Sequence, residues 1–157
     1  MVDSIEFAKY IINRFLFLNI DKNGKTTLSE TKLHKLMYIC DGLLLSADIN
    51  LVDENPKAWN YGPVYPRVNN WLKKEPGALE KCHNDISEDS PEIKDAIVLI
   101  DAVVSSWGLW SANKLSNWSH SPGSPWEKAL KKGKGYMNSV IDKKDMRKYF
   151  QEMIGGN

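Results

Sequence analysis

The sequence of this protein has few cysteines, no long hydrophobic run and almost no excess of charge of one sign. Its two cysteines, Cys40 and Cys82, are too few for the disulfide framework of a small secreted domain, so we expect reduced thiols. Twenty-one basic and 20 acidic residues give a net charge of +1. This balance excludes, by composition, a strongly basic nucleic-acid-binding domain and a polybasic membrane anchor.

Hydrophobic runs long enough for a membrane helix, which needs about 20 apolar residues, are also absent from the sequence. The longest candidate, residues 15–20, follows Asp3 and Glu6, whereas a signal peptide carries basic residues at this point. We therefore expect a cytoplasmic protein without a membrane partner. With 157 residues, 42% of them apolar, the chain fits one domain over residues 1–157.

The first 46 residues carry two helical patterns. Ser4 is expected to cap the first helix and Ser29 the second, with the polar stretch 19–26 between them. Apolar residues recur three and four positions apart at Ala8, Ile11, Ile12, Phe15 and Leu16, and at Leu33, Leu36, Met37, Cys40, Leu43 and Leu44. Two helices joined by a short turn are expected to pack antiparallel.

The helical period disappears between residues 47 and 66, where prolines and a glycine forbid a continuous helix. Tyr65 precedes a proline and is therefore pushed out of the helical region, while Pro66 suits the first turn of a short helix. We predict an extended chain or short hairpin here.

The second half of the chain is again helical in pattern. The apolar stripe from Ile93 to Trp107 is the most regular in the sequence; it predicts a central helix that starts at Ser90 and ends with Gly108 at its C-terminal cap. Three shorter helices are expected to begin after Ser111, Ser124 and Asp142, the second with a capping box that includes Glu127.

Together these patterns predict a mainly α fold. It is a single compact bundle of six or seven helices, with one extended or short β-hairpin segment around residues 48–65.

Motifs for metal binding are weak. The segment Asn19–Gly24 with Glu30 resembles an EF-hand loop, but only Asp21 and Glu30 would bring negative charge, so a plain connection between helices is favoured over a calcium site. Zinc is usually bound by cysteine and histidine; those present are His34, Cys40, Cys82, His83 and His120. They lack the paired spacing of zinc sites. We expect no metal and no cofactor.

Motifs for catalysis are equally weak. Ser119, His120 and Ser121 are neighbours in sequence, but adjacent residues rarely form a nucleophile with an oriented base. There is no phosphate-binding P-loop and no dinucleotide fingerprint. We expect no catalytic residue, and we predict that the protein is not an enzyme.

Charge and aromatic residues are distributed unevenly. Residues 75–101 hold eight acids and two lysines, and residues 131–148 hold seven bases and two acids, patterns typical of solvated faces or of surfaces that steer an oppositely charged partner. Among six tryptophans and six tyrosines, Trp59, Tyr61 and Tyr65 lie in the extended segment. They are candidates for surface anchors of an interface; the alternative is that they pin this segment onto the core.

Three segments, taken together, resemble the Panacea domain, a SocA-like antitoxin family associated with phages. They are Leu33-His34-Lys35-Leu36-Met37-Tyr38, Ala58-Trp59-Asn60-Tyr61-Gly62-Pro63-Val64, and Leu115-Ser116-Asn117-Trp118-Ser119-His120 followed by Pro125-Trp126. They occur in the order of the family and cover most of the chain. His34 stands where glutamine is common, and Ser119 stands where threonine often precedes the histidine; these departures leave the choice of partner open.

The resemblance implies an antitoxin that neutralises a cognate protein toxin by direct binding, without catalysis, the toxin being commonly encoded by the adjacent gene. Residues that would build the scaffold or bind the partner are Leu33, Lys35, Leu36, Tyr38, Trp59, Tyr61, Gly62, Pro63, Val64, Leu115, Ser116, His120, Pro125 and Trp126. Candidate contacts with the toxin are Trp59, Tyr61, Tyr65 and Arg67. In this interpretation Gly62-Pro63 fixes a sharp turn, and His120 with Trp126 ties two short helices together.

Two other functions remain open. One is a DNA-binding or protease-adaptor protein of a mobile element or prophage; the DNA-binding version would use the basic segment 131–148. The other is a small enzyme, which would require a polar pocket with convergent titratable groups. Nucleic acid is a possible but less favoured partner, because the net charge is close to zero.

Overall fold

The computed structural model of the chain describes residues 1–18, 28–82, 86–135 and 138–155. The helices in these ranges are α1 (Ser4–Phe17), α2 (Glu30–Ser46), α3 (Pro66–Lys74), α4 (Pro91–Lys94), α5 (Ile97–Trp107), α6 (Ala112–Ser119), α7 (Pro125–Lys132) and α8 (Lys143–Gly155). The strands are β1 (Lys57–Trp59), β2 (Gly62–Val64) and β3 (Ser139–Val140). The mainly α prediction is confirmed. No helix among these residues is long and apolar enough to span a membrane.

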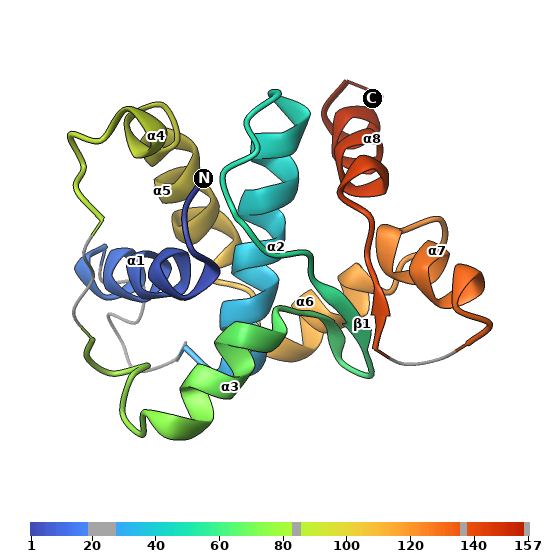
Figure 1. The fold of residues 1–157 in the computed structure, drawn as a ribbon, viewed down its shortest axis with the longest axis horizontal. Helices are drawn as coiled ribbons and strands as arrows, with labels where there is room; N and C mark the ends of the chain where they lie inside the picture. Colours follow the sequence, from blue (N-terminus) through green and yellow to red (C-terminus); the bar gives the residue numbers. More distant parts are fainter. Residues whose placement is uncertain (19–27, 83–85, 136–137, 156–157) are drawn as a thin grey trace.

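The helix at the centre of the molecule is α2, not the later helix with the more regular stripe. Helices α1 and α5 lie on one side of α2 and α8 on the other, with the β1–β2 hairpin beside its first half (Figure 1). Every residue from Lys32 to Gly42 is buried. A helix covered on all sides has no apolar stripe to detect, which is why the sequence pattern misplaced the centre.

The predicted helix over residues 90–107 is two helices, so the described residues contain eight helices, one more than the highest number predicted. A tight turn, in which the N–H of Ala96 donates to the carbonyl of Ile93 at 2.8 Å, separates α4 from α5. Gly108 ends α5 as expected, with φ of −61° in the right-handed region. A Cβ there would overlap the carbonyl oxygen of Val104, so glycine serves close packing.

Most helix starts lie where the sequence placed them. The side chains of Ser29, Ser111 and Ser124 each accept a hydrogen bond from the N–H group three residues later. The first helix differs, because Asp3 accepts the capping hydrogen bond. Ser4 is already helical, and its hydroxyl donates to Glu54 at 2.7 Å.

The extended segment forms the predicted hairpin and gains a third strand. β1 pairs antiparallel with β2, Ala58 opposite Pro63, and on its other edge antiparallel with β3, so the strand order is β2-β1-β3. β3 has only two residues, too short for an alternating pattern to reveal it. The EF-hand-like segment falls mainly on residues 19–27, which lie outside the described residues.

Phe150 packs helix α8 against α2. The ring of Phe150 lies against Gly42, and its centroid is 5.5 Å from that of Tyr38 and 6.1 Å from that of Trp118. A Cβ at Gly42 would overlap this ring. The glycine therefore allows the close approach of the two helices.

We predict that Gly42→Ala destabilises the fold by about 1–3 kcal/mol, because the added methyl group overpacks the contact with Phe150. The matched control is Gly155→Ala at the end of α8, where an added Cβ meets no atom within 4 Å. We expect the control to stay within about 0.5 kcal/mol of the unsubstituted protein. Urea unfolding measures both; equal midpoints for the two variants would contradict this packing.

Candidate partner-binding site

The three motif segments converge on the β1–β2 hairpin. Gly62 begins β2 with φ of +110°, a conformation that favours glycine. A Cβ on this residue would overlap both the hydroxyl of Ser119 and the side chain of Lys35. The turn of the hairpin therefore packs directly against α2 and α6.

Side chains from three helices bind the main chain of this hairpin. Lys35 Nζ on α2 donates to the carbonyl of Pro63 at 3.0 Å, and Ser116 Oγ on α6 donates to the carbonyl of Tyr61 at 2.6 Å. The indole N–H of Trp126 on α7 donates to the carbonyl of Trp59 at 2.8 Å. These bonds satisfy carbonyl groups at a short sheet and fix its position on the helices.

Two contacts made by aromatic side chains stabilise the same region. The rings of His120 and Trp126 stack with centroids 4.0 Å apart, which joins the end of α6 to α7 as expected. Burial, with a smaller effect of the Lys35 charge, lowers the pKa of His120. The indole N–H of Trp59 donates to Asn138 Oδ1 at 2.9 Å, which links β1 to the segment before β3.

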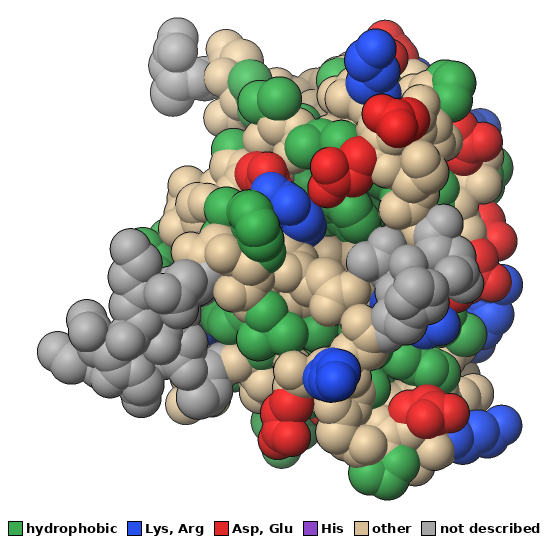
Figure 2. Space-filling view, turned by 90° about the vertical axis from the view of Figure 1, so that its left-hand side faces the viewer, with side chains coloured by type: hydrophobic (Ala, Val, Ile, Leu, Met, Phe, Trp, Pro, Cys, Tyr) green, Lys and Arg blue, Asp and Glu red, His purple; other side chains and the backbone are tan. Residues whose placement is uncertain are grey.

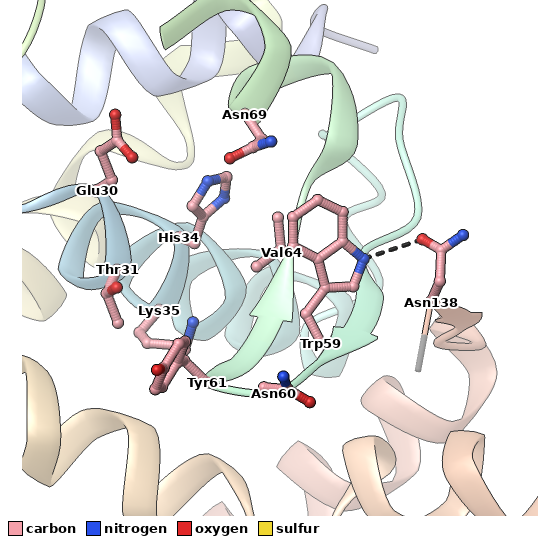
Figure 3. A pocket seen from close by; sticks show the side chains of 10 residues that line it. All are labelled: Glu30, Thr31, His34, Lys35, Trp59, Asn60, Tyr61, Val64, Asn69 and Asn138. Carbon is pink, nitrogen blue, oxygen red and sulfur yellow. Dashed lines mark hydrogen bonds between the residues drawn. The ribbon is translucent and has the colours of Figure 1, made fainter. Parts of the chain in front are cut away.

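Beside the hairpin lies a pocket of about 520 Å³ (Figure 3). It is bounded by the first turns of α2, by the hairpin, by α3 and by Asn138. Its lining residues are Glu30, Thr31, His34, Lys35, Trp59, Asn60, Tyr61, Val64, Asn69 and Asn138. Tyr61, at the turn, is 72% exposed. A concave, largely apolar surface with a few polar groups is the usual form of a binding site.

Two buried titratable residues of α2 face this pocket. Lys35 is 0% exposed, and burial lowers its pKa to about 7. His34 is 2% exposed; burial, and to a lesser degree the Lys35 charge, lowers its pKa to about 3. The N–H of Tyr65 donates to His34 Nδ1 at 3.2 Å. His34 is therefore neutral at physiological pH, and its proton is on Nε2.

Tyr65 is not a surface anchor, contrary to one of the two sequence interpretations. It is fully buried, and its hydroxyl donates to Asp41 Oδ2 at 2.7 Å. Lys143 on α8 pairs with the same carboxylate at 3.3 Å. Tyr65 turns inward because a buried carboxylate requires partners, so here the alternative interpretation, pinning to the core, is correct. Burial raises the pKa of Asp41 to about 6, while Lys143 and Tyr65 oppose this shift.

The other predicted residues divide into core and surface. Arg67 is partly exposed but pairs with Asp53 and Glu54, so it is not a free cation at the surface. Leu33, Leu36, Tyr38, Gly62, Pro63, Val64, Leu115, Ser116 and Pro125 are buried. Trp59 and Tyr61 are the two predicted contacts that present aromatic surface beside the pocket.

Sequence reasoning missed the residues that come to the site from elsewhere in the chain. Asn69 and Asn138 line the pocket from α3 and from the segment before β3, with no local pattern that distinguishes them from other surface asparagines. The one available signal concerned Asp41, a carboxylate among the apolar residues of the second predicted helix. Such a residue is rarely buried without partners.

We predict that Lys35→Met changes how stability depends on pH. The pKa of Lys35 falls from 10.5 to about 7 on folding. The folded state thus binds fewer protons than the unfolded chain between these values, and the stability from neutral Lys35 is lost as pH falls from about 10 to 7. The variant lacks this loss. As pH falls, the free energy of unfolding of the variant, relative to that of the unsubstituted protein, should therefore rise by up to about 1.4 kcal/mol per pH unit. The difference should level off below pH 7.

Urea unfolding between pH 6 and 9.5 measures this difference. Lys73→Met, on the exposed face of α3, controls for the loss of one surface charge. Parallel stability curves for Lys35→Met and the unsubstituted protein would show that Lys35 is not desolvated as described.

Comparison with known proteins places this arrangement in a family. Antitoxin SocA of Caulobacter vibrioides (strain NA1000 / CB15N) is 29% identical to this chain over 140 residues, an alignment that covers 80% of the chain and 69% of the relative. No solved structure is significantly similar to this chain. The family model described as "Antitoxin SocA-like, Panacea domain" matches residues 33–127, a range that runs from α2 into α7 and includes the hairpin. The chain therefore belongs to the SocA-like antitoxin family, with a Panacea domain.

Proposed function

We propose that this protein is an antitoxin that neutralises a protein toxin by binding it directly, and that the β1–β2 hairpin and the neighbouring pocket form the contact surface. Membership of an antitoxin family and similarity to a protein named Antitoxin SocA support the antitoxin role. Inhibition by binding requires a shaped surface and no chemical step, so the protein need not be an enzyme.

The observation that carries the proposal is an exposed aromatic side chain on a fixed backbone. Tyr61 is 72% exposed, whereas its carbonyl accepts a hydrogen bond from Ser116 and the next residue packs against Lys35. An interface gains affinity when its anchors are already ordered, because less conformational entropy is lost on binding. Tyrosine and tryptophan are preferred anchors of this kind.

A second face of the molecule offers less to a partner. Figure 2 shows the side formed by α1, α4 and α5, where hydrophobic side chains lie in separate patches between acidic and basic ones. The exposed apolar residues of α1 and α5 include Phe17 and Val98. Scattered apolar residues are normal for a soluble surface and do not by themselves indicate an interface.

The basic segment 131–148 fits DNA less well than its composition indicates. Ion pairs join Lys131 to Glu127, Lys132 to Asp145, Lys143 to Asp41 and Arg147 to Asp48. Four of its seven bases thus have a carboxylate beside them. The three pairs other than Lys143–Asp41 lie at the surface and each add little stability, but all four reduce the positive potential available for phosphate contacts.

Expression together with the adjacent reading frame tests the proposal. We expect the neighbouring product to arrest growth alone, and we expect this protein to restore growth and to copurify with it at a fixed stoichiometry. A neighbour that remains toxic and unbound would overturn direct neutralisation. Rescue that depends on a host protease and lowers the toxin level would favour the protease-adaptor alternative instead.

We predict that Tyr61→Ala weakens the complex about 30-fold or more, as expected for an anchor worth about 2 kcal/mol, without unfolding the protein. Its side chain is largely exposed, so its loss leaves the core intact. The matched control is Val98→Ala on α5, at a side chain that is 79% exposed. Calorimetric titration with the toxin measures both; unchanged affinity for Tyr61→Ala would remove the hairpin from the interface.

A further inference from the structure

Lys35 is a buried cation without a carboxylate partner. It is 0% exposed, and within the described residues its hydrogen-bond acceptor is the neutral carbonyl of Pro63. Moving an ammonium group out of water is costly unless an opposite charge compensates for it. The buried carboxylate of α2, Asp41, has such compensation in Lys143.

A second buried donor belongs to the same pocket, the imidazole N–H of His34. Because the N–H of Tyr65 donates to His34 Nδ1, the proton of this neutral ring is on Nε2. His34 Nε2 is buried and has no hydrogen-bond partner among the residues that the structure describes. Buried donors are nearly always satisfied, so this one points to an acceptor supplied from outside.

Both donor residues line the pocket. His34 and Lys35 are consecutive residues of α2, and both line the cavity with the rings of Trp59 and Tyr61 (Figure 3). An ammonium group has three donors, of which the bond to Pro63 uses one. An entering group with two acceptor oxygens and one negative charge would satisfy both residues.

We propose that this pocket is a binding site for a carboxylate group, which pairs with Lys35 and accepts a hydrogen bond from His34 Nε2. This goes beyond neutralisation of a toxin, because it assigns the chemistry of a ligand to one cavity. The carboxylate can belong to an Asp or Glu side chain of a protein or to a small free acid. Trp59 and Tyr61 provide apolar walls for the carbon atoms that carry it.

The charged and titratable groups around Lys35 shape this preference. His34 on α2 and His120 at the end of α6 both have lowered pKa values, so neither adds positive charge near pH 7. The hairpin contributes the Pro63 carbonyl, and Tyr61 and, from α3, Asn69 also line the pocket. Glu30, one turn earlier on α2, is exposed to water, which screens its repulsion of a ligand.

Binding of a carboxylate must be coupled to proton uptake. The pKa of Lys35 is about 7 in the free protein, and an adjacent negative charge raises the pKa of an amine. A carboxylate therefore binds the protonated form more tightly. By linkage, its affinity should decrease as pH rises above 7.

The experiment is titration of the full chain with N-acetyl-glutamate N-methylamide, followed by NMR shifts of the backbone amides and of the Lys35 ammonium group. We expect saturable shifts at the pocket and a Kd about tenfold weaker at pH 8.5 than at pH 6.5. The matched probe is the glutamine analogue, in which an NH2 group replaces one carboxylate oxygen and removes the charge; it should bind far more weakly. Equal binding of the two probes, or no shift at the pocket, would overturn the proposal.

Lys35→Met should abolish the response to the glutamate probe. If this variant does not fold, the comparison of the two probes and of the two pH values on the unsubstituted protein decides the question. Acetate and succinate form the second arm: tighter binding of the blocked glutamate assigns the site to a protein side chain, and tighter binding of a free acid assigns it to a small molecule. No toxin takes part, so failure here leaves direct neutralisation standing.

Discussion

Burial of α2 on all sides is the constraint on which the other features depend. A helix without a solvent-facing stripe must bury its polar residues too, and each of them needs a partner from a neighbouring element. Asp41 receives the hydroxyl of Tyr65 and the ammonium of Lys143, which ties α8 and the start of α3 to the centre. His34 and Lys35 receive main-chain groups of the segment 63–65 and keep unused donors at the pocket.

The hairpin combines a fixed backbone with an exposed tip. Its carbonyl groups accept hydrogen bonds from α2, α6 and α7, and Gly62 occupies a position where a side chain would not fit. In these contacts the motif residues lie almost entirely on the core side of the hairpin. Tyr61 and part of Trp59 remain outside, so one set of residues builds the scaffold while a few neighbours are available to a partner. This separation allows surface residues to differ without loss of the fold.

Electrostatics distinguish two regions of the molecule. Around α7 and α8, four of the seven basic residues of segment 131–148 pair with acidic ones, which reduces the local excess of positive charge. At the pocket the reverse holds, because a single buried lysine with no carboxylate partner among the described residues has a stronger local effect than several paired surface lysines. The local electrostatic effect therefore depends more on whether a charge is buried than on the number of charges.

The sequence by itself determined the mainly α class, most helix starts and the hairpin, because capping serines, Pro66 and Gly62 act through their own backbone neighbours. It did not determine that α2 is central, that Tyr65 turns inward or that β3 completes the sheet. Tertiary structure decided these, since burial on all sides removes the helical stripe and the partners Asp41 and Lys143 are distant in sequence from the residues they bind. The pocket likewise depends on Asn69 and Asn138, which only folding brings to His34 and Lys35.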